Sequence, residues 1–74
     1  MDYTYDKFLG KRISILRQQN HLTQEELTAK LQLVGCDMTR SALAKIEVGQ
    51  RHIYAYEIKA ISQALSISFD DLLL

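Results

Sequence analysis

No proline occurs in this sequence, and only three glycines, at positions 10, 35 and 49, interrupt its 74 residues. Proline breaks a helix and glycine commonly ends one, so a chain that is poor in both favours helices joined by tight turns. No Asn-Gly pair marks a β-hairpin. The sequence therefore predicts an all-α fold.

The length and composition fit a single small domain that spans residues 1–74. Apolar residues make up 47% of the chain and the formal net charge is zero, so the chain is hydrophobic enough to collapse. It is too short for two cores. No apolar run approaches the roughly 20 residues of a membrane span, and the acidic, polar start is unlike a signal peptide. We therefore expect a cytoplasmic protein that does not associate with membranes.

Groups suited to catalysis or metal binding are sparse. Cys36 is the only cysteine, and together with His21 and His52 it supplies three scattered ligands that make a poor metal site. No set of nucleophile, base and orienting group stands out, and no glycine-rich phosphate loop is present. We expect no enzymatic activity, no metal and no other cofactor. A chain of this length also leaves no room for a small-molecule effector site.

Apolar residues at helical spacing divide the chain into short helices. The five segments lie at about residues 5–19, 23–33, 39–48, 55–65 and 68–73. Thr23 and Glu26 have the spacing of a capping box, and Thr39 is a favourable N-cap for the third segment. Gly35 and Gly49 are placed to end the second and third helices. We expect a compact bundle of five helices.

The net charge of zero hides an uneven distribution. The stretch from Lys7 to Arg51 carries eight basic and four acidic residues, which gives +4, and the two ends together carry −4. A basic centre fits a nucleic-acid-binding surface. Ordinary solvated charge explains the same pattern equally well.

The third helix carries the most informative surface. Its inward side holds Leu43 and Ile46, and its outward side consists of Arg40, Ser41, Ala44, Lys45 and Val48. A short cationic face with small residues fits the major groove. There, arginine and lysine donate hydrogen bonds to guanine, and serine either donates or accepts one. We expect base contacts from Arg40, Ser41, Ala44 and Lys45. The alternative, which the helix pattern alone favours, is a solvated surface helix.

Other polar residues lie where a DNA backbone would pass. Gln24 is in the first turn of the second helix, where free amides and the helix dipole favour phosphate. The loop after the third helix, on the far side of this helix from Gln24 along the chain, is able to bind phosphate. The candidate backbone contacts are Thr23, Gln24, Thr39, Gln50 and Arg51. For Gln24, a plain surface glutamine is an equally good interpretation.

Three runs of sequence, at residues 9–13, 22–27 and 46–49, read LGKRI, LTQEEL and IEVG. With this spacing the chain resembles the phage-repressor/Cro-like helix-turn-helix family over about residues 8–73. The resemblance implies an all-α, compact five-helix bundle of the lambda-repressor-like type, with its helix-turn-helix unit at about residues 23–48. It also implies double-stranded DNA as a partner and a dimer on a near-palindromic operator.

The resemblance implies roles for individual residues. Gln24 matches a glutamine that contacts phosphate, and Arg40, Ser41 and Lys45 match base-reading positions. Arg17 and Glu47 match a buried ion pair that ties the first helix to the recognition helix.

Two features depart from the family pattern. Thr28 stands where the family usually has alanine, at the close approach of the second and third helices. The turn between these helices is also longer, from Gln32 to Met38, so we expect the second helix to extend and the loop at residues 35–37 to bulge outward.

Apolar residues are crowded near the C-terminus. One short turn does not readily bury all of Ile67, Phe69, Leu72 and Leu73, so we expect them to form the surface of a homodimer. The alternative is that they close the core of the monomer.

Our leading hypothesis is a sequence-specific DNA-binding transcriptional regulator, repressor-like, that binds operator DNA as a dimer through the third helix. The alternative is a protein-interaction module or antitoxin-type component that keeps the helix-turn-helix fold with weak or no DNA binding. The neutral net charge favours the alternative, and the cations of the third helix argue against it.

Overall fold

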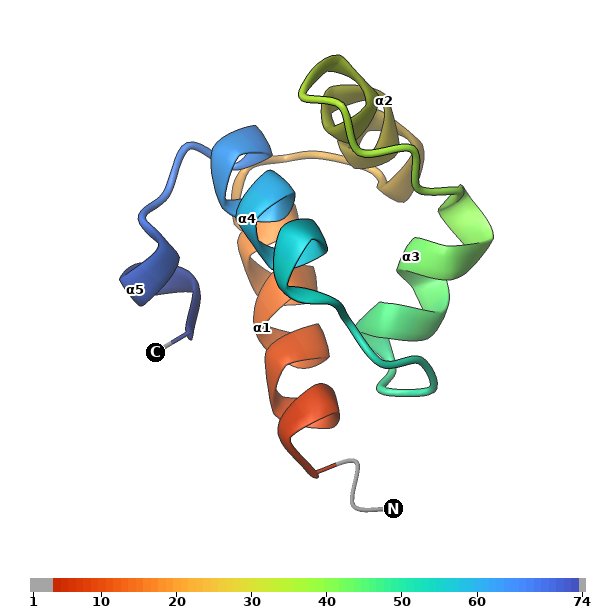
Figure 1. Ribbon diagram of the computed structural model, residues 1–74, viewed down its shortest axis with the longest axis vertical. Helices are drawn as coiled ribbons and strands as arrows, with labels where there is room; N and C mark the ends of the chain where they lie inside the picture. Colours follow the sequence, from red (N-terminus) through yellow and green to blue (C-terminus); the bar gives the residue numbers. More distant parts are fainter. Residues whose placement is uncertain (1–3, 74) are drawn as a thin grey trace.

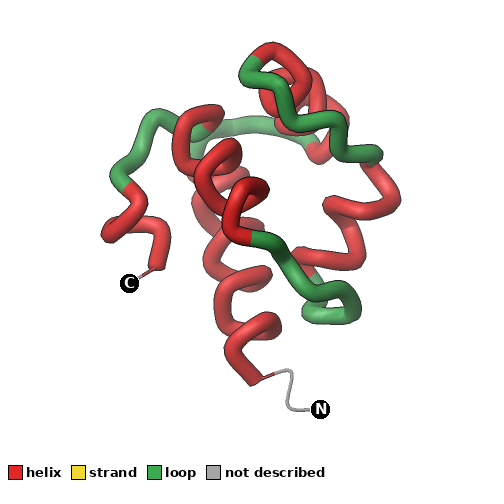
Figure 2. The backbone as a smooth tube through the Cα atoms, in the orientation of Figure 1, coloured by secondary structure: helices red, strands yellow, loops and turns green. Residues whose placement is uncertain are grey.

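The computed structural model describes residues 4–73, which form five helices and, within that range, no strand (Figures 1 and 2). The helices are α1 (Thr4–Gln19), α2 (Gln24–Leu33), α3 (Arg40–Glu47), α4 (Ala55–Ala64) and α5 (Phe69–Leu73). Each lies within one residue of the bounds expected from the sequence, so the all-α prediction is confirmed. No helix in the described range is long and apolar enough to cross a membrane.

The long helix α1 runs through the middle of the molecule, with α3 on one side and α5 on the other (Figure 1). Helix α2 packs on α3 and α4, and α4 also contacts α5. The side chains at the centre are Leu9, Ile13, Leu27, Leu31, Leu43, Ile46, Ile61 and Leu72. Every helix except α4 contributes a leucine to this set, so one core joins the five elements.

The ends of α2 and α3 follow the expected capping chemistry. The Thr23 hydroxyl accepts from the Glu26 amide at 3.0 Å, and the Glu26 carboxylate accepts from the Thr23 amide at 2.9 Å. The Thr39 hydroxyl accepts from the Ala42 amide at 3.1 Å. Gly35 and Gly49, with φ of +86° and +75°, take the left-handed conformation just past each helix.

Gly10 has a different use from the other glycines, because it lies inside α1. A Cβ atom at this position would collide with the backbone carbonyl of Ile46 in α3. The missing side chain therefore lets the backbones of α1 and α3 touch. This contact brings the end of α3 close to the first half of α1.

The loop between α2 and α3 differs from the expectation of an outward bulge. Gly35 and Asp37 are exposed, but Cys36 is buried and its amide donates to the Leu31 carbonyl at 2.9 Å. The bond folds the loop back over the end of α2 and turns the thiol inward. The prediction was wrong for Cys36, because an apolar side chain in a long turn finds cover in the core. The half-buried Thr28 donates its hydroxyl proton to the Glu25 carbonyl at 2.8 Å.

Helix α5 corrects one residue of the expected dimer surface. Leu72 is fully buried and belongs to the monomer core, so it is unavailable to a second copy. Ile67 and Leu73 are partly buried against the same core, and Phe69 is 44% exposed. The short helix is also held by Arg12, which donates to the Asp71 carbonyl at 2.9 Å.

Candidate nucleic-acid interface

Helix α3 presents the surface that the residue spacing predicted. Its exposed residues are Arg40, Ser41 and Lys45, followed by Val48 just past the helix, and Ala44 between them is half-buried. Leu43 and Ile46 are buried beneath this surface. The exposed face is therefore cationic at both ends and small in the middle.

A buried network holds α3 in place. Arg17 of α1 donates from Nε to Glu47 Oε2 at 2.7 Å and from Nη2 to Glu47 Oε1 at 3.0 Å. Its Nη1 donates to the Leu22 carbonyl at 2.7 Å. The Arg17 and Glu47 side chains are only 12% and 5% exposed, respectively. The hydrogen bond to Glu47 raises the pKa of Arg17, against the lowering effect of burial.

Gln24 joins the same network from the first turn of α2. Its Nε2 donates to Glu47 Oε1 at 3.1 Å, so one carboxylate receives three hydrogen bonds from two helices. Beside this amide is a hollow of about 480 Å³ lined by Arg17, Thr23, Gln24, Glu25 and Arg40. The starts of α2 and α3 therefore border one polar depression.

Arg51 is less free than the sequence suggested. Its guanidinium donates to both Glu57 oxygens, at 3.0 and 2.9 Å, and to the His52 carbonyl at 2.9 Å. Three of the five N–H donors of the side chain are thus engaged. We expected Arg51 to reach a DNA phosphate, but the structure directs it onto the start of α4.

Glu57 was not singled out from the sequence. It is 3% exposed, and its Oε1 also accepts from the Tyr54 amide at 3.0 Å, as a helix N-terminal acid often does. Burial acts to raise the pKa of Glu57, but the bonds from Arg51 and Tyr54 outweigh it and lower the pKa. The signal in the sequence was an acid three residues after the N-cap position Tyr54.

Comparison with protein families identifies the fold. A family model described as helix-turn-helix matches residues 13–72, which is most of the chain. The chain belongs to the Cro/C1-type helix-turn-helix family. No curated protein and no solved structure gave a significant match. The members of this family are DNA-binding, non-catalytic domains, and the five-helix arrangement is consistent with the lambda-repressor-like fold.

Three aromatic side chains of the helix-turn-helix domain cluster where the loop after α3 joins α4. The rings of Tyr54 and Tyr56 are stacked at 6.1 Å between centroids, and the His52 ring lies edge-on to Tyr54 at 5.4 Å. The Arg51 guanidinium is 5.8 Å from the Tyr54 centroid. These contacts further restrain the Arg51 side chain toward α4.

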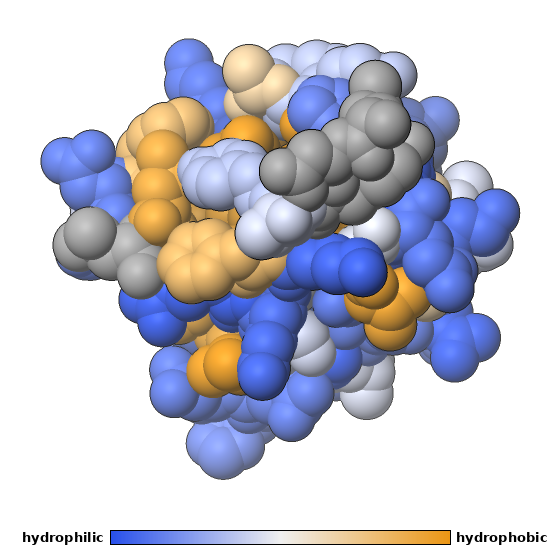
Figure 3. Space-filling view, turned by 90° about the horizontal axis from the view of Figure 1, so that it is seen from below, coloured by the Kyte–Doolittle hydropathy of each residue, from blue (hydrophilic) through white to orange (hydrophobic). Residues whose placement is uncertain are grey.

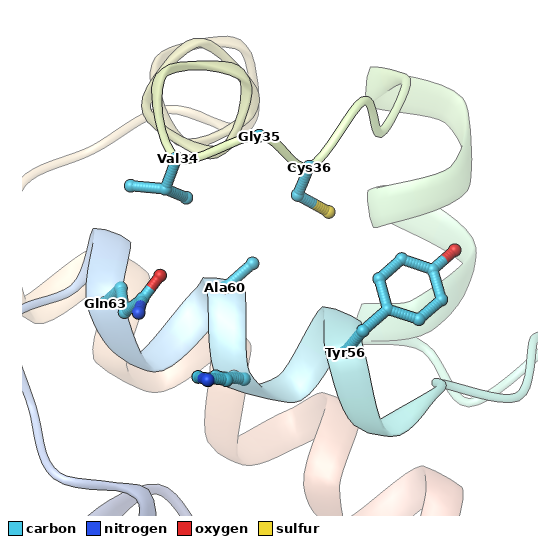
Figure 4. A pocket seen from close by; sticks show the side chains of 7 residues that line it. Val34, Gly35, Cys36, Tyr56, Ala60 and Gln63 are labelled. Atoms are coloured by element: carbon cyan, nitrogen blue, oxygen red, sulfur yellow. The ribbon is translucent and has the colours of Figure 1, made fainter.

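A cavity of about 280 Å³ lies between the α2–α3 loop and α4 of the domain, with the Cys36 sulfur facing it (Figure 4). The lining residues are Val34, Gly35, Cys36, Tyr56, Lys59, Ala60 and Gln63, among which there is no histidine or carboxylate. Burial raises the pKa of the Cys36 thiol, helped by the charges of Glu57 and Asp37, so the thiol stays protonated at neutral pH. The lining therefore offers no histidine or carboxylate to deprotonate the thiol.

Proposed function

We propose that this helix-turn-helix protein is a sequence-specific transcriptional regulator, repressor-like, that binds operator DNA with α3 in the major groove. The observation that carries the proposal is the state of Arg40 and Lys45. Both are exposed, and within residues 4–73 neither has an ion-pair partner. Two unpaired cations on one face of a rigidly held helix suit an anionic, hydrogen-bonding partner.

The proposed base contacts follow from the positions on α3. Arg40 in the first turn donates to guanine O6 and N7, and Ser41 either donates or accepts. The small side chain of Ala44 lets the helix backbone approach the bases. Lys45, one turn later, donates to guanine or to phosphate. Thr23, Gln24, Thr39 and Gln50 are the proposed contacts to the DNA backbone, since they flank this face at its two ends.

The proposed form on DNA is a homodimer. An eight-residue helix reads only a few base pairs, so selectivity requires two half-sites about 34 Å apart. With Leu72 assigned to the core, the dimer surface reduces to Ile67, Phe69 and Leu73.

The edge of α1 extends this apolar surface. Phe8 and Ile15 are exposed. Phe8 lies four residues before Arg12 and Ile15 lies three residues after it, so both are on the side of α1 where Arg12 bonds to α5. Apolar side chains gather on the α5 side of the molecule in the view from below (Figure 3). A second copy of the chain would cover these side chains.

Selection of bound duplexes from a random DNA pool tests the proposal. The expected result is enrichment of an inverted repeat whose half-site centres are about one helical turn apart. A pool that shows no enrichment would contradict DNA-directed regulation and favour a protein-interaction module.

A further inference from the structure

The first turns of α1 lie against the turn that follows α3. Gly49 has a φ of +75°, and a Cβ atom there would come within 2.9 Å of the Lys7 Cα and would overlap the Lys7 side chain. Figure 1 shows the end of α3 and the following loop beside the N-terminal half of α1. Lys7 is therefore in backbone contact with the C-terminal end of the recognition helix.

A second contact on the same side directs the neighbouring acid elsewhere. Asp6 is buried, and its Oδ1 is 3.1 Å from Nδ1 of His52 in the loop after Gly49. The Asp6 carboxylate, which is the closest in sequence to Lys7, therefore contacts His52 between α1 and this loop. It makes no ion pair with Lys7.

Lys7 itself is exposed, and no ion-pair partner for it occurs among residues 4–73. Lys11, one turn later on the same side of α1, is exposed and unpaired in the same range. The two ammonium groups form a short cationic row that begins at the end of α3. Arg51, the cation of the loop itself, is bound to Glu57.

We propose that Lys7 is a phosphate-binding residue of the DNA interface, in the place that the sequence suggested for Arg51, with Lys11 and Gln50 beside it. The inference rests on the proposed function. Thr39, the N-cap of α3, is the proposed backbone contact at the opposite end of that helix. Helix α3 has eight residues and is about 12 Å long, close to the width of the major groove. Contacts at its two ends therefore suit phosphates on the two sides of the groove.

The salt dependence of binding distinguishes Lys7 from Arg51. Each cation that neutralises a phosphate adds about 0.9 to the slope of log K against log salt concentration. A random-sequence duplex is the probe, and fluorescence anisotropy over a salt series gives the slope. We expect Lys7→Gln to lower the slope by about 0.9 per bound domain. Lys7→Glu lowers the affinity further, whereas Arg51→Gln leaves the slope unchanged.

Lys59→Gln is the matched control, because Lys59 is an exposed lysine on α4 that lines the Cys36 cavity, away from the exposed face of α3. Circular dichroism verifies that each variant is folded. A wild-type protein that binds DNA, with an unchanged slope for Lys7→Gln, overturns the role of Lys7 alone. A Lys59→Gln variant whose slope falls by as much as that of Lys7→Gln also overturns the role of Lys7. A wild-type protein that binds no duplex overturns the proposed function and this inference together.

Discussion

Arg17 and Glu47 are separated by 30 residues in sequence and joined by two hydrogen bonds of 2.7 and 3.0 Å. The pair locks the last turn of α1 to the last residue of α3. Because Gln24 bonds to the same carboxylate, the start of α2 and the end of α3 are joined through one acid. The orientation of α3 is therefore set by a buried polar network as well as by apolar packing.

Replacing Glu47 with alanine should strongly destabilise the protein. The change leaves the Arg17 guanidinium nearly buried without its counter-charge, and losing one partner of such a pair costs roughly 3 kcal/mol. Urea unfolding of the variant measures the loss. Glu25→Ala, at an exposed position on α2, serves as the control and should change little. Equal effects of the two substitutions would show that the pair contributes nothing special.

Gly10→Ala should destabilise the protein, although alanine is normally the better helix residue by about 1 kcal/mol. The added methyl group collides with the Ile46 carbonyl, and overpacking of this kind costs about 1–3 kcal/mol. The sign of the change in unfolding free energy is the test. A stabilised variant would mean that α1 and α3 do not approach as closely as described.

Glu57 should make stability depend on pH in the acid range. Its pKa is lowered in the folded state, so its contribution is present above the unfolded value of about 4.3 and is lost as pH falls through the folded value. We expect Glu57→Gln to be less stable than wild type at neutral pH, with the gap closing below about pH 4. Urea midpoints over a pH series test this expectation. A gap that stays constant with pH would contradict it.

Arg40→Ala should change which DNA is bound as well as how tightly. Loss of a bidentate contact to guanine costs about 1–3 kcal/mol and relaxes the preference at one base pair in each half-site. Binding to the selected operator and to single-base variants measures both effects. Lys30→Ala, on the exposed side of α2, is the control and should keep the preference. An equal loss for operator and scrambled DNA would place Arg40 on phosphate instead.

Substitutions at Phe69 and Leu72 should have different effects, although the two residues are only three positions apart. The first should affect dimer formation and the second should affect folding stability. Phe69→Ala removes an exposed side chain and is expected to weaken the dimer with little loss of monomer stability. Leu72→Ala empties part of the core and should cost about 2–5 kcal/mol of unfolding free energy. Sedimentation, with and without operator DNA, reports the first effect and urea unfolding the second. A Phe69→Ala protein that still dimerises like wild type would exclude this face.

The features that the sequence determined by itself are local. The capping box of Thr23 and Glu26, the cap at Thr39 and the left-handed Gly49 each depend on residues within four positions of one another. The exposed face of α3 is local in the same sense, because helical geometry alone places residues 40, 41 and 45 away from the buried Leu43 and Ile46. Short-range hydrogen bonds and periodicity therefore sufficed for the helix bounds and the candidate base contacts.

Only the tertiary structure decided which helix covers which face. It buried Leu72 in the monomer core, turned Cys36 inward, paired Arg51 with Glu57 and brought Lys7 beside Gly49. The Arg17–Glu47 pair was implied by family resemblance, and no local pattern would have joined two residues on different helices. Periodicity marks the side of a helix that avoids water, but the partner for that side is chosen by the packing of all five helices together. Backbone contacts such as Gly10 against Ile46 set that packing, and they have no counterpart in the order of residues along one helix.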